Sequence, residues 1–286
     1  MPSAKKLAVI GDPISHSLSP VLQNFLIRHF ALPFTYEALH VRLANLPAMI
    51  QRLRDGEFHG INVTIPHKQA VLPLLDEIEE TAARIGAVNT IAVDNGKLLG
   101  YNTDVIGFRR SLEAANISVE GKTVLVLGAG GAARAVVFAL LQALAGKIFL
   151  CNRSKARVEE LMTTLAKYAA DGRLQNVPWL NRNSWIAATA PEVIVNTTSV
   201  GMHPQIHESP LSNHVFTLNQ VAVDLVYNPL QTAFLQAAIA ADAKTINGLG
   251  MLIHQGVAAL ELWSKTPLDI RGIYSNLENE LRNALK

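Results

Sequence analysis

The sequence has little charge, a single cysteine and no long apolar run. Only 17% of the 286 residues are charged, and 25 Lys and Arg stand against 23 Asp and Glu, which gives a formal net charge of +2. This balance excludes a protein whose main ligand is a nucleic acid, because such binding depends on a basic face. The lone Cys151 excludes an internal disulfide and a cysteine-based zinc site.

Apolar residues make up 49% of the chain, but no stretch approaches the ~18 uninterrupted apolar residues of a membrane span. The run at 7–10 ends at Gly11 and is too short for the core of a signal peptide. The low charge also excludes a mainly disordered chain. We therefore expect a globular, cytoplasmic protein with no nucleic-acid or membrane partner, built from one large domain or two ordinary ones.

Short apolar runs alternate with longer amphipathic segments along the chain. Strands are predicted over 7–10, 34–41, 60–65, 88–93, 97–100, 123–127, 148–151, 193–196 and 221–225. Helices are predicted over 19–29, 46–54, 104–115, 134–145, 154–169, 231–241, 249–264 and 269–285, and a further helix is predicted to begin at Pro66. This alternation predicts an α/β fold with parallel sheets that have helices on both faces. Asn95-Gly96 predicts a tight hairpin turn.

A new strand–helix unit begins at Thr123, which predicts two domains with a boundary at 104–121. The first domain is expected to be discontinuous, because the last helices can pack back on it. It would comprise residues 1–104 and 251–286. Residues 105–250 would form the second domain, a dinucleotide-binding domain of the Rossmann type.

A glycine-rich loop lies between the strand predicted at 123–127 and the following helix, and it fits the pattern G-x-G-x-x-A. Its residues are Gly128, Ala129, Gly130, Gly131, Ala132 and Ala133. Gly128 permits a tight turn, Gly130 lets the backbone approach a pyrophosphate, and the helix N-terminus offers free N–H groups to the phosphates. Glycine-rich turns also occur where a strand and a helix simply pack closely, so the motif alone does not decide the function.

The end of the next strand distinguishes NADP from NAD. An NAD site usually carries an acidic residue there, about 20 residues after the glycine loop. This chain instead has Asn152, Arg153, Ser154, Lys155 and Arg157. Guanidinium groups match a phosphate in geometry and charge, so the segment favours the 2′-phosphate of NADP. The alternative is a solvated basic turn.

Polar loops follow several strands of the first domain. Ser17 and Ser19 offer hydroxyls at a helix N-terminus, a natural cradle for a carboxylate, although Ser19 could simply cap that helix. Asn62 and Thr64 lie on one face of a strand. Lys68 lies in the first turn of the next helix, where a cation opposes the helix dipole, although a surface lysine is the common alternative.

Nine stretches, in this order, resemble the shikimate dehydrogenase family, including its shikimate/quinate members. They are Gly11–Pro20, Asn62–Lys68, Gly86–Thr90, Asn102–Asp104, Gly128–Ala132, Asn152–Arg157, Asn196–Gly201, Asp224–Pro229 and Gly248–Gln255. The resemblance implies an NADPH-dependent reduction of 3-dehydroshikimate to shikimate, in an open cleft between two α/β domains. The sequence departs from the family at two positions. Asn247 stands where many members carry Asp, and Tyr101 stands where some members carry Asp.

The resemblance also implies roles for individual residues. Lys68 and Asp104 match the catalytic pair. The residues that match substrate contacts are Ser17, Ser19, Asn62, Thr64, Asn89, Asp104, Tyr227 and Gln255. Gly128–Ala132 and Asn152–Arg157 match the pyrophosphate and 2′-phosphate sites. Further cofactor contacts match Glu80, Leu225 and Gly248.

Three other functions fit parts of the sequence. A quinate/shikimate dehydrogenase with dual use of NAD and NADP is the nearest alternative. A non-catalytic regulator that binds the same metabolite belongs to another class, and the intact Lys68 and Asp104 argue against it. A different NADP enzyme on the same layout would need other polar loops in the first half. The chain can be a monomer or a homodimer, and an apolar edge in the first domain slightly favours the dimer.

Overall fold

The computed structural model describes residues 4–169, 172–211 and 216–285. Its contacts divide the chain into two compact units. Unit 1 contains Met1–Gly107 and Leu252–Lys286, and unit 2 contains Phe108–Met251. Within the described ranges, no helix is long and apolar enough to cross a membrane, and no group of three or more His, Cys, Asp or Glu side chains could hold a metal ion.

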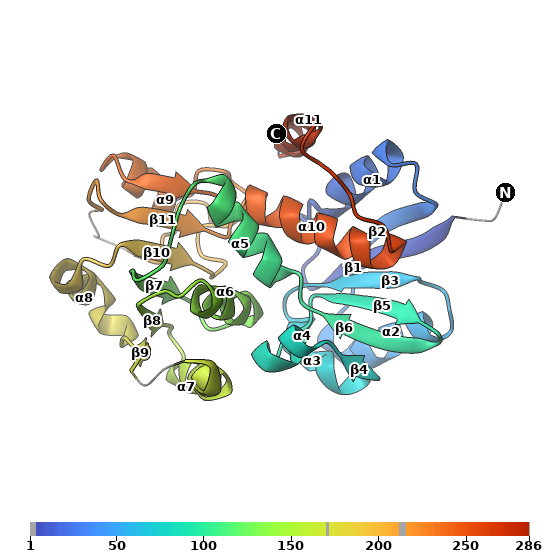
Figure 1. The fold of residues 1–286 in the computed structure, drawn as a ribbon, viewed down its shortest axis with the longest axis horizontal. Helices are drawn as coiled ribbons and strands as arrows, with labels where there is room; N and C mark the ends of the chain where they lie inside the picture. The colour runs from blue at the N-terminus through green and yellow to red at the C-terminus, as the bar shows by residue number, and fades with distance from the viewer. Residues whose placement is uncertain (1–3, 170–171, 212–215, 286) are drawn as a thin grey trace. The chain divides into compact units, whose positions relative to one another are not determined.

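Unit 1 is built on a six-stranded sheet in the order β2-β1-β3-β5-β6-β4 (Figure 1). The strands are β1 (Lys5–Gly11), β2 (Phe34–His40), β3 (Gly60–Val63), β4 (Glu77–Ile78), β5 (Thr90–Asp94) and β6 (Lys97–Tyr101). This sheet is mixed rather than wholly parallel as predicted, because β5 runs antiparallel to both β3 and β6 while the other neighbouring strands are parallel. The predicted Asn95-Gly96 turn is confirmed and explains the reversal, since both residues have positive φ and join neighbouring strands directly.

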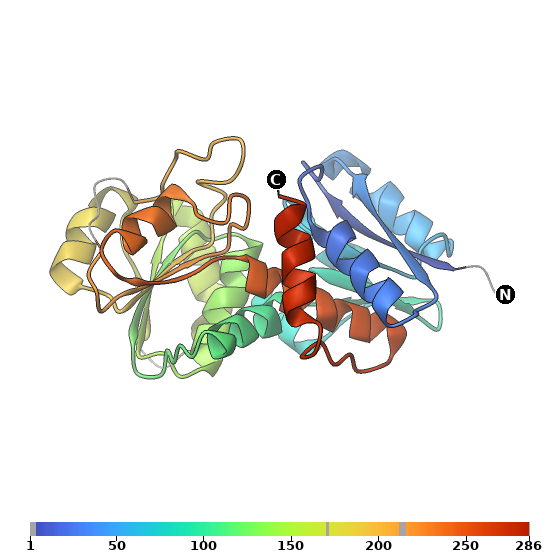
Figure 2. The same ribbon diagram turned by 90° about the horizontal axis from the view of Figure 1, so that it is seen from above.

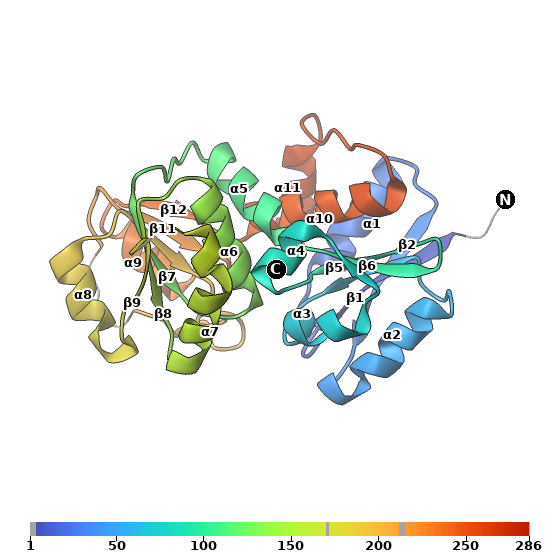
Figure 3. The same ribbon diagram turned by 60° about the horizontal axis from the view of Figure 1, so that its bottom comes forward.

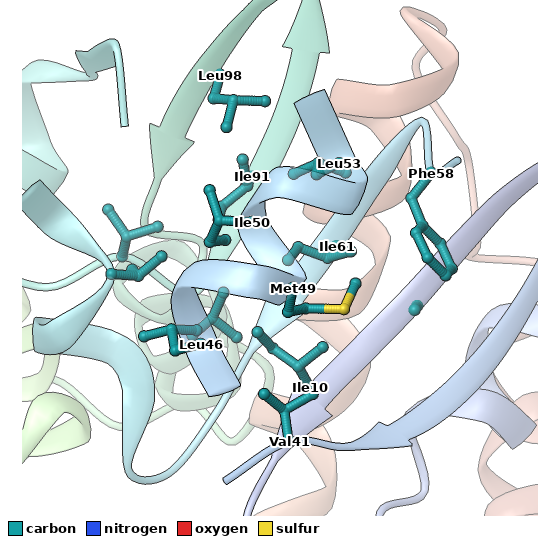
Figure 4. Packing of buried hydrophobic residues seen from close by; sticks show 14 of the residues in the cluster. Ile10, Val41, Leu46, Met49, Ile50, Leu53, Phe58, Ile61, Ile91 and Leu98 are labelled. Atoms are coloured by element: carbon teal, nitrogen blue, oxygen red, sulfur yellow. The ribbon is translucent and has the colours of Figure 1, made fainter. Parts of the chain in front are cut away.

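Helices cover both faces of this sheet. They are α1 (Ser19–His29), α2 (Leu46–Arg54), α3 (His67–Ala70), α4 (Glu80–Ile85), the start of α5 (Asp104–Ala114), most of α10 (Leu249–Ser264) and α11 (Tyr274–Asn283). Figure 2 shows α1 and α11 side by side, and Figure 3 shows α2 and α3 on the opposite face of the sheet. Helix α2 directs Leu46, Met49, Ile50 and Leu53 onto the strands, at the spacing of one helix face (Figure 4).

Unit 2 contains a second six-stranded sheet, in the order β12-β11-β10-β7-β8-β9. Its strands are β7 (Thr123–Leu127), β8 (Lys147–Cys151), β9 (Leu174–Asn176), β10 (Val193–Asn196), β11 (Val221–Asp224) and β12 (Lys244–Ile246). All neighbouring strands are parallel, which confirms the prediction for this half. The remaining helices are the end of α5, α6 (Gly131–Gln142), α7 (Lys155–Leu165), α8 (Arg182–Thr189), α9 (Ala233–Ile239) and the start of α10.

Short 3₁₀ turns supplement the regular elements. They lie at Leu43–Asn45, Leu72–Leu74, Ala166–Tyr168 and Trp179–Asn181. One face of the unit 2 sheet packs against α8 and α9 in a continuous apolar cluster that includes Ile186 and Phe234. The apolar runs of β7, β10 and β11 are almost fully buried, as expected for parallel strands covered on both faces.

The predicted cap of α1 and the predicted start of the last helix are wrong. Ser19 does not cap α1, because it is already the first helical residue and Leu18 occupies the N-cap without a side-chain bond. The last helix begins at Tyr274 rather than at Asp269. The Asp269 carboxylate accepts a hydrogen bond from the backbone N–H of Arg271 (3.0 Å), and this local turn competes with helix formation.

Candidate active site

Lys68 and Asp104 form an ion pair in unit 1. Lys68 is the second residue of α3, which follows β3, and Asp104 is the first residue of α5. The Lys68 side chain is 13% exposed and the Asp104 side chain 6%, so the pair is largely shielded from water. The Lys68 carbonyl accepts a hydrogen bond from the Val88 N–H (2.8 Å), which anchors α3 to the loop before β5. The structure thus brings the two residues that match the catalytic pair into direct contact.

Asn89 connects this pair to the rest of the unit. Its Nδ2 donates to Asp104 Oδ1 (2.9 Å) and to Thr103 Oγ1 (3.0 Å). A longer hydrogen bond of 3.4 Å runs from the same atom to Gln255 Oε1 on α10. The Gln255 amide in turn donates to the Leu252 carbonyl (2.9 Å). Asn89 and Gln255, both expected at the substrate site, therefore lie beside the Lys68–Asp104 pair.

Asn62 lies at the end of β3 and joins the same polar cluster. Its Nδ2 donates to Thr90 Oγ1 (3.0 Å) and to the Asn89 carbonyl (3.2 Å). Its Oδ1 accepts a hydrogen bond from the Tyr36 hydroxyl (2.6 Å). Tyr36 and Thr90 are not among the predicted site residues. A buried tyrosine on a strand is typical of a core position, and Thr90 is distinguished only by its place next to Asn89.

The two serines and Thr64 lie in loops of the same unit. Ser17 is half-buried and its Oγ accepts a weak hydrogen bond from the Ser19 N–H (3.3 Å). Thr64 directly follows β3, and its N–H donates to the Ile10 carbonyl (3.0 Å). In the part of the chain that the structure describes, no hydrogen bond joins these three hydroxyls to the Asn62–Asn89–Asp104 cluster. Tyr227 belongs to unit 2, where it is half-buried after β11.

The glycine loop of unit 2 has the geometry that the sequence motif predicts. Gly128 has a φ of +117°, and a Cβ there would lie 2.3 Å from Thr197 Oγ1, so no other residue fits. Gly130 is the N-cap of α6, and a Cβ on it would meet no atom within 4 Å. The backbone therefore presents the open N-terminal turn of α6, whose first N–H groups have no partner within the helix.

The cationic segment begins at the end of the neighbouring strand. In the parallel register of β7 and β8, Leu127 is opposite Cys151, so the glycine loop and the cationic segment leave the sheet at the same edge. Arg153 and Arg157 are exposed. Lys155 is also exposed and forms a surface pair with Glu159 (3.4 Å). This places three cations beside the open helix N-terminus.

The smaller residues of the segment have local roles. The Asn152 Nδ2 donates to the Ser154 carbonyl (3.1 Å) and holds the turn. Ser154 occupies the N-cap of α7, but its hydroxyl forms no capping bond.

Leu225 and Gly248 lie together at the ends of β11 and β12. A Cβ on Gly248 would lie 2.1 Å from the Leu225 carbonyl, so the close approach of the two backbones requires glycine. The Gly248 N–H donates to the Val226 carbonyl (3.1 Å). Glu80 lies on α4 of unit 1, where it is exposed and paired with Arg84.

Comparison with known proteins gives the family. A model of the shikimate dehydrogenase substrate binding domain matches residues 9–91, and a model of shikimate/quinate 5-dehydrogenase matches residues 111–215. A shikimate 5′-dehydrogenase C-terminal domain model matches residues 248–274. The chain belongs to the shikimate dehydrogenase family. The family resemblance predicted from the sequence motifs is thereby confirmed.

Individual relatives within the shikimate dehydrogenase family cover nearly the whole chain. The NADP(+) shikimate dehydrogenase of Geobacillus kaustophilus is 41% identical over 261 residues, which are 91% of this chain and 92% of the relative. The shikimate 5-dehydrogenase of Thermus thermophilus, solved in complex with NADP(H) and shikimate, has a TM-score of 0.84 and 38% identity over 98% of this chain and 99% of that one. The shikimate dehydrogenase of Aquifex aeolicus has a TM-score of 0.87 and 38% identity over 99% of both chains. These neighbours confirm the predicted α/β class and the Rossmann-type fold of unit 2.

Proposed function

We propose that this member of the shikimate dehydrogenase family reduces 3-dehydroshikimate to shikimate with NADPH, by reversible hydride transfer at C3, as a step of aromatic amino acid and chorismate biosynthesis. The observation that carries the proposal is the shielded Lys68–Asp104 pair, set among amide and hydroxyl groups in the unit that matches the substrate-binding family model. The relatives that cover nearly the whole chain are NADP(+) shikimate dehydrogenases.

The residues of unit 2 fit NADP. The loop Gly128–Ala132 and the open first turn of α6 would hold the pyrophosphate, since the backbone there approaches a ligand without obstruction. The exposed cations Arg153, Lys155 and Arg157 would hold the 2′-phosphate, with Asn152 and Ser154 shaping the turn. Leu225, Gly248 and Glu80 are proposed as further cofactor contacts. NADPH, when bound, supplies the hydride.

In unit 1, Lys68 would protonate the substrate oxygen. When C3 of the substrate is reduced, its carbonyl oxygen gains negative charge and needs a proton donor within hydrogen-bond reach. The Lys68 ammonium can give that proton and regain one from solvent. Asp104 holds the ammonium in a fixed direction through the ion pair and is itself held by Asn89.

The remaining polar groups of the site would bind the substrate. The hydroxyls of Ser17 and Ser19 would donate hydrogen bonds to the substrate carboxylate near the start of α1. The ring hydroxyls would be held by Asn62, Thr64, Asn89, Gln255 and, from unit 2, Tyr227.

Steady-state kinetics with four substrate–cofactor pairs tests the function. We expect kcat/KM for shikimate to exceed that for quinate, and NADP to be preferred over NAD. Comparable values for quinate, or for NAD, would indicate instead a quinate/shikimate dehydrogenase with dual cofactor use. Binding of shikimate without turnover would indicate a metabolite-binding regulator and would refute the proposed enzyme.

We further propose that the protein works in the cytoplasm, where its single cysteine stays reduced. A homodimer is proposed through β2, which is an edge strand of the unit 1 sheet and has unpaired backbone groups along one side. Sedimentation velocity over a range of protein concentrations would measure the mass in solution, and a monomer at all concentrations would refute the dimer.

A further inference from the structure

A continuous chain of hydrogen bonds runs through the buried side of the unit 1 site. The Tyr36 hydroxyl donates to Asn62 Oδ1 (2.6 Å), and Asn62 Nδ2 donates to Thr90 Oγ1 (3.0 Å). Thr90 Oγ1 lies 3.0 Å from Asn89 Oδ1, and Asn89 Nδ2 donates to Asp104 Oδ1 (2.9 Å). The chain thus begins at Tyr36 and ends at the carboxylate that holds Lys68.

The orientation of the Asn89 amide follows from partners with only one possible role. The backbone N–H of Thr103, which can only donate, lies 2.7 Å from one end of this amide, so that end is the oxygen. The other end is therefore the nitrogen, and it faces Asp104 Oδ1. An ionised carboxylate only accepts hydrogen bonds, which agrees with this orientation.

The Asn62 amide is oriented by the same logic. The backbone carbonyl of Asn89, which can only accept, lies 3.2 Å from one end of the amide, so that end is the nitrogen. The Asn62 oxygen then faces Tyr36 and requires its hydroxyl to donate. Thr90 accepts from Asn62, and the nearest acceptor for its own hydrogen is Asn89 Oδ1 at 3.0 Å, closer than Thr103 Oγ1 at 3.3 Å. Every hydrogen bond in the chain consequently points from Tyr36 towards Asp104.

Burial makes these orientations costly to change. Thr90 is fully buried, and Tyr36, Asn62 and Asn89 are each nearly so. A reversed amide would bring like groups together in a region where water cannot replace the lost partners. Both Asn62 amide hydrogens are used inside the protein, so this residue can meet a ligand only through the second lone pair of its oxygen, as an acceptor for a hydroxyl.

We propose that Tyr36 and Thr90 are positioning residues of the substrate site. Through the one-way chain they fix the amides of Asn62 and Asn89, so that Asn62 accepts a substrate hydroxyl and Asn89 holds the carboxylate of Asp104. This inference rests on the proposed function, in which Asn62 and Asn89 belong to the substrate site. Neither Tyr36 nor Thr90 needs to touch the substrate for this role.

The test uses substitutions that remove a hydroxyl and keep the shape. Tyr36→Phe is expected to raise the KM for 3-dehydroshikimate about two- to tenfold, the range for one lost hydrogen bond, with little change in kcat. Thr90→Val leaves one Asn62 amide hydrogen without an acceptor in the interior and removes one hydrogen bond to Asn89 Oδ1, so kcat/KM is expected to fall about ten- to hundredfold. Thr90→Ser keeps the hydroxyl and should restore most of the activity. The KM for NADPH should stay unchanged in all three variants.

Matched controls separate positioning from general damage. Tyr274→Phe removes a hydroxyl at the start of α11, and Thr266→Val alters an exposed residue after α10, both in unit 1. Both should leave KM and kcat at wild-type values. The proposal is overturned if Tyr36→Phe and Thr90→Val behave like these controls, or if Thr90→Ser is as impaired as Thr90→Val at an equal melting temperature.

A second measurement is independent of turnover. In ligand-free protein, Tyr36→Phe should shift the side-chain ¹⁵N–¹H resonances of both Asn62 and Asn89, because the chain links them, whereas Tyr274→Phe should not. Unshifted resonances would refute the chain itself. If Tyr36→Phe shifts these resonances but the wild-type protein does not turn over 3-dehydroshikimate, the proposed function is refuted and the hydrogen-bond chain still stands.

Discussion

Among the described residues, each unit buries one aspartate, Asp104 at the start of α5 and Asp224 at the end of β11, and the two have different partners. Asp104 in unit 1 is paired with the cation Lys68 and accepts from the Asn89 amide. Asp224 in unit 2 is fully buried and accepts only from neutral groups, namely the Asn196 amide (2.9 Å), the Val226 N–H (3.0 Å) and the Thr232 hydroxyl (2.6 Å). The same residue type is thus shielded from water in two electrostatic settings.

The surroundings of Asp224 affect its protonation. Burial raises the pKa of Asp224 to about 6, and its hydrogen bonds to Thr232, Val226 and Asn196 offset only part of that effect. Asp224 ties the end of β11 to the end of β10 and to the N-cap of α9, which is a structural role. Asp104 holds a cation that can move a proton. We infer that Asp104, which is paired with a cation, takes part in the chemistry of the site. Asp224, which is held by neutral donors, serves to stabilise the fold.

The largest expected effect comes from removing the cation of unit 1. Lys68→Ala should lower kcat by about 10²–10⁴, the usual contribution of a general acid or base, with a smaller change in the KM for substrate. Stopped-flow or steady-state absorbance of NADPH measures the rate. Lys97→Ala is the matched control, because Lys97 forms an exposed ion pair with Glu77 in the same unit. Near-normal turnover of Lys68→Ala would show that the lysine paired with Asp104 is not used in catalysis. The comparison of Asp104 with Asp224 would then lose its functional basis.

Neutralising the carboxylate of the same pair should have the next largest effect. Asp104→Asn keeps the shape but leaves Lys68 without its counter-ion at a shielded position, and breaking a buried pair costs about 3–5 kcal/mol. We expect kcat to fall about ten- to hundredfold and the melting temperature to fall with it, measured by steady-state kinetics and calorimetry. Asp94→Asn, which breaks an exposed pair with Lys265, should change neither by a comparable amount.

In unit 2 the contrast predicts a pH effect on stability rather than on catalysis. The folded pKa of Asp224, about 6, lies above its ordinary value of 3.8, so the folded state binds more protons than the unfolded state between these pH values. The free energy of unfolding should therefore fall as pH rises from about 4 to about 6, by up to ~3 kcal/mol from this group. Below about pH 4 Asp224 is protonated in both states and does not lower the free energy of unfolding. Above about pH 6 the full decrease has taken place.

Asp224→Asn isolates that contribution. The variant stays neutral at every pH, and its Nδ2 can donate to Thr232 in place of the present bond, so the slope between pH 4 and 6 should flatten. Urea unfolding at several pH values gives the difference from the wild type. Asp242→Asn, at an exposed aspartate of the same unit, should keep the wild-type slope. An unchanged slope in Asp224→Asn would show that Asp224 is not the group that titrates between pH 4 and 6.

The two sheets differ in how far the sequence predicts them. The core strands of unit 2 are short runs of β-branched and apolar residues followed by glycine or polar residues, a pattern typical of strands buried on both faces. β9 and β12 are not predicted, because polar residues such as the half-buried Gln175 and the exposed Lys244 break the apolar pattern. β4 has only two residues, and α4 and α8 are too short for a clear period of 3.6.

The individual residues of the site are predicted from the sequence, but the contacts between them are not. Lys68 and Asp104 are 36 residues apart, and nothing in the local pattern of either shows that they touch, so their pairing comes from the family resemblance. Tyr36 and Asn62 are 26 residues apart and meet because β1 pairs in parallel with both β2 and β3. Local sequence patterns describe one strand at a time, whereas this contact depends on the order of three.

The smallest expected effect concerns cations that are exposed rather than buried. Arg157→Ala should raise the KM for NADPH about two- to fivefold, because a solvated charge contributes about 0.2–1 kcal/mol, and the KM for NADH should stay unchanged. The increase should shrink at high salt, where the wild-type contact is already screened, whereas the effect of Lys68→Ala should persist. Arg109→Ala, at an exposed arginine on α5, is the control. An equal loss with both cofactors would show that Arg157 does not contact the 2′-phosphate, and the exposed cluster would then be a solvated turn.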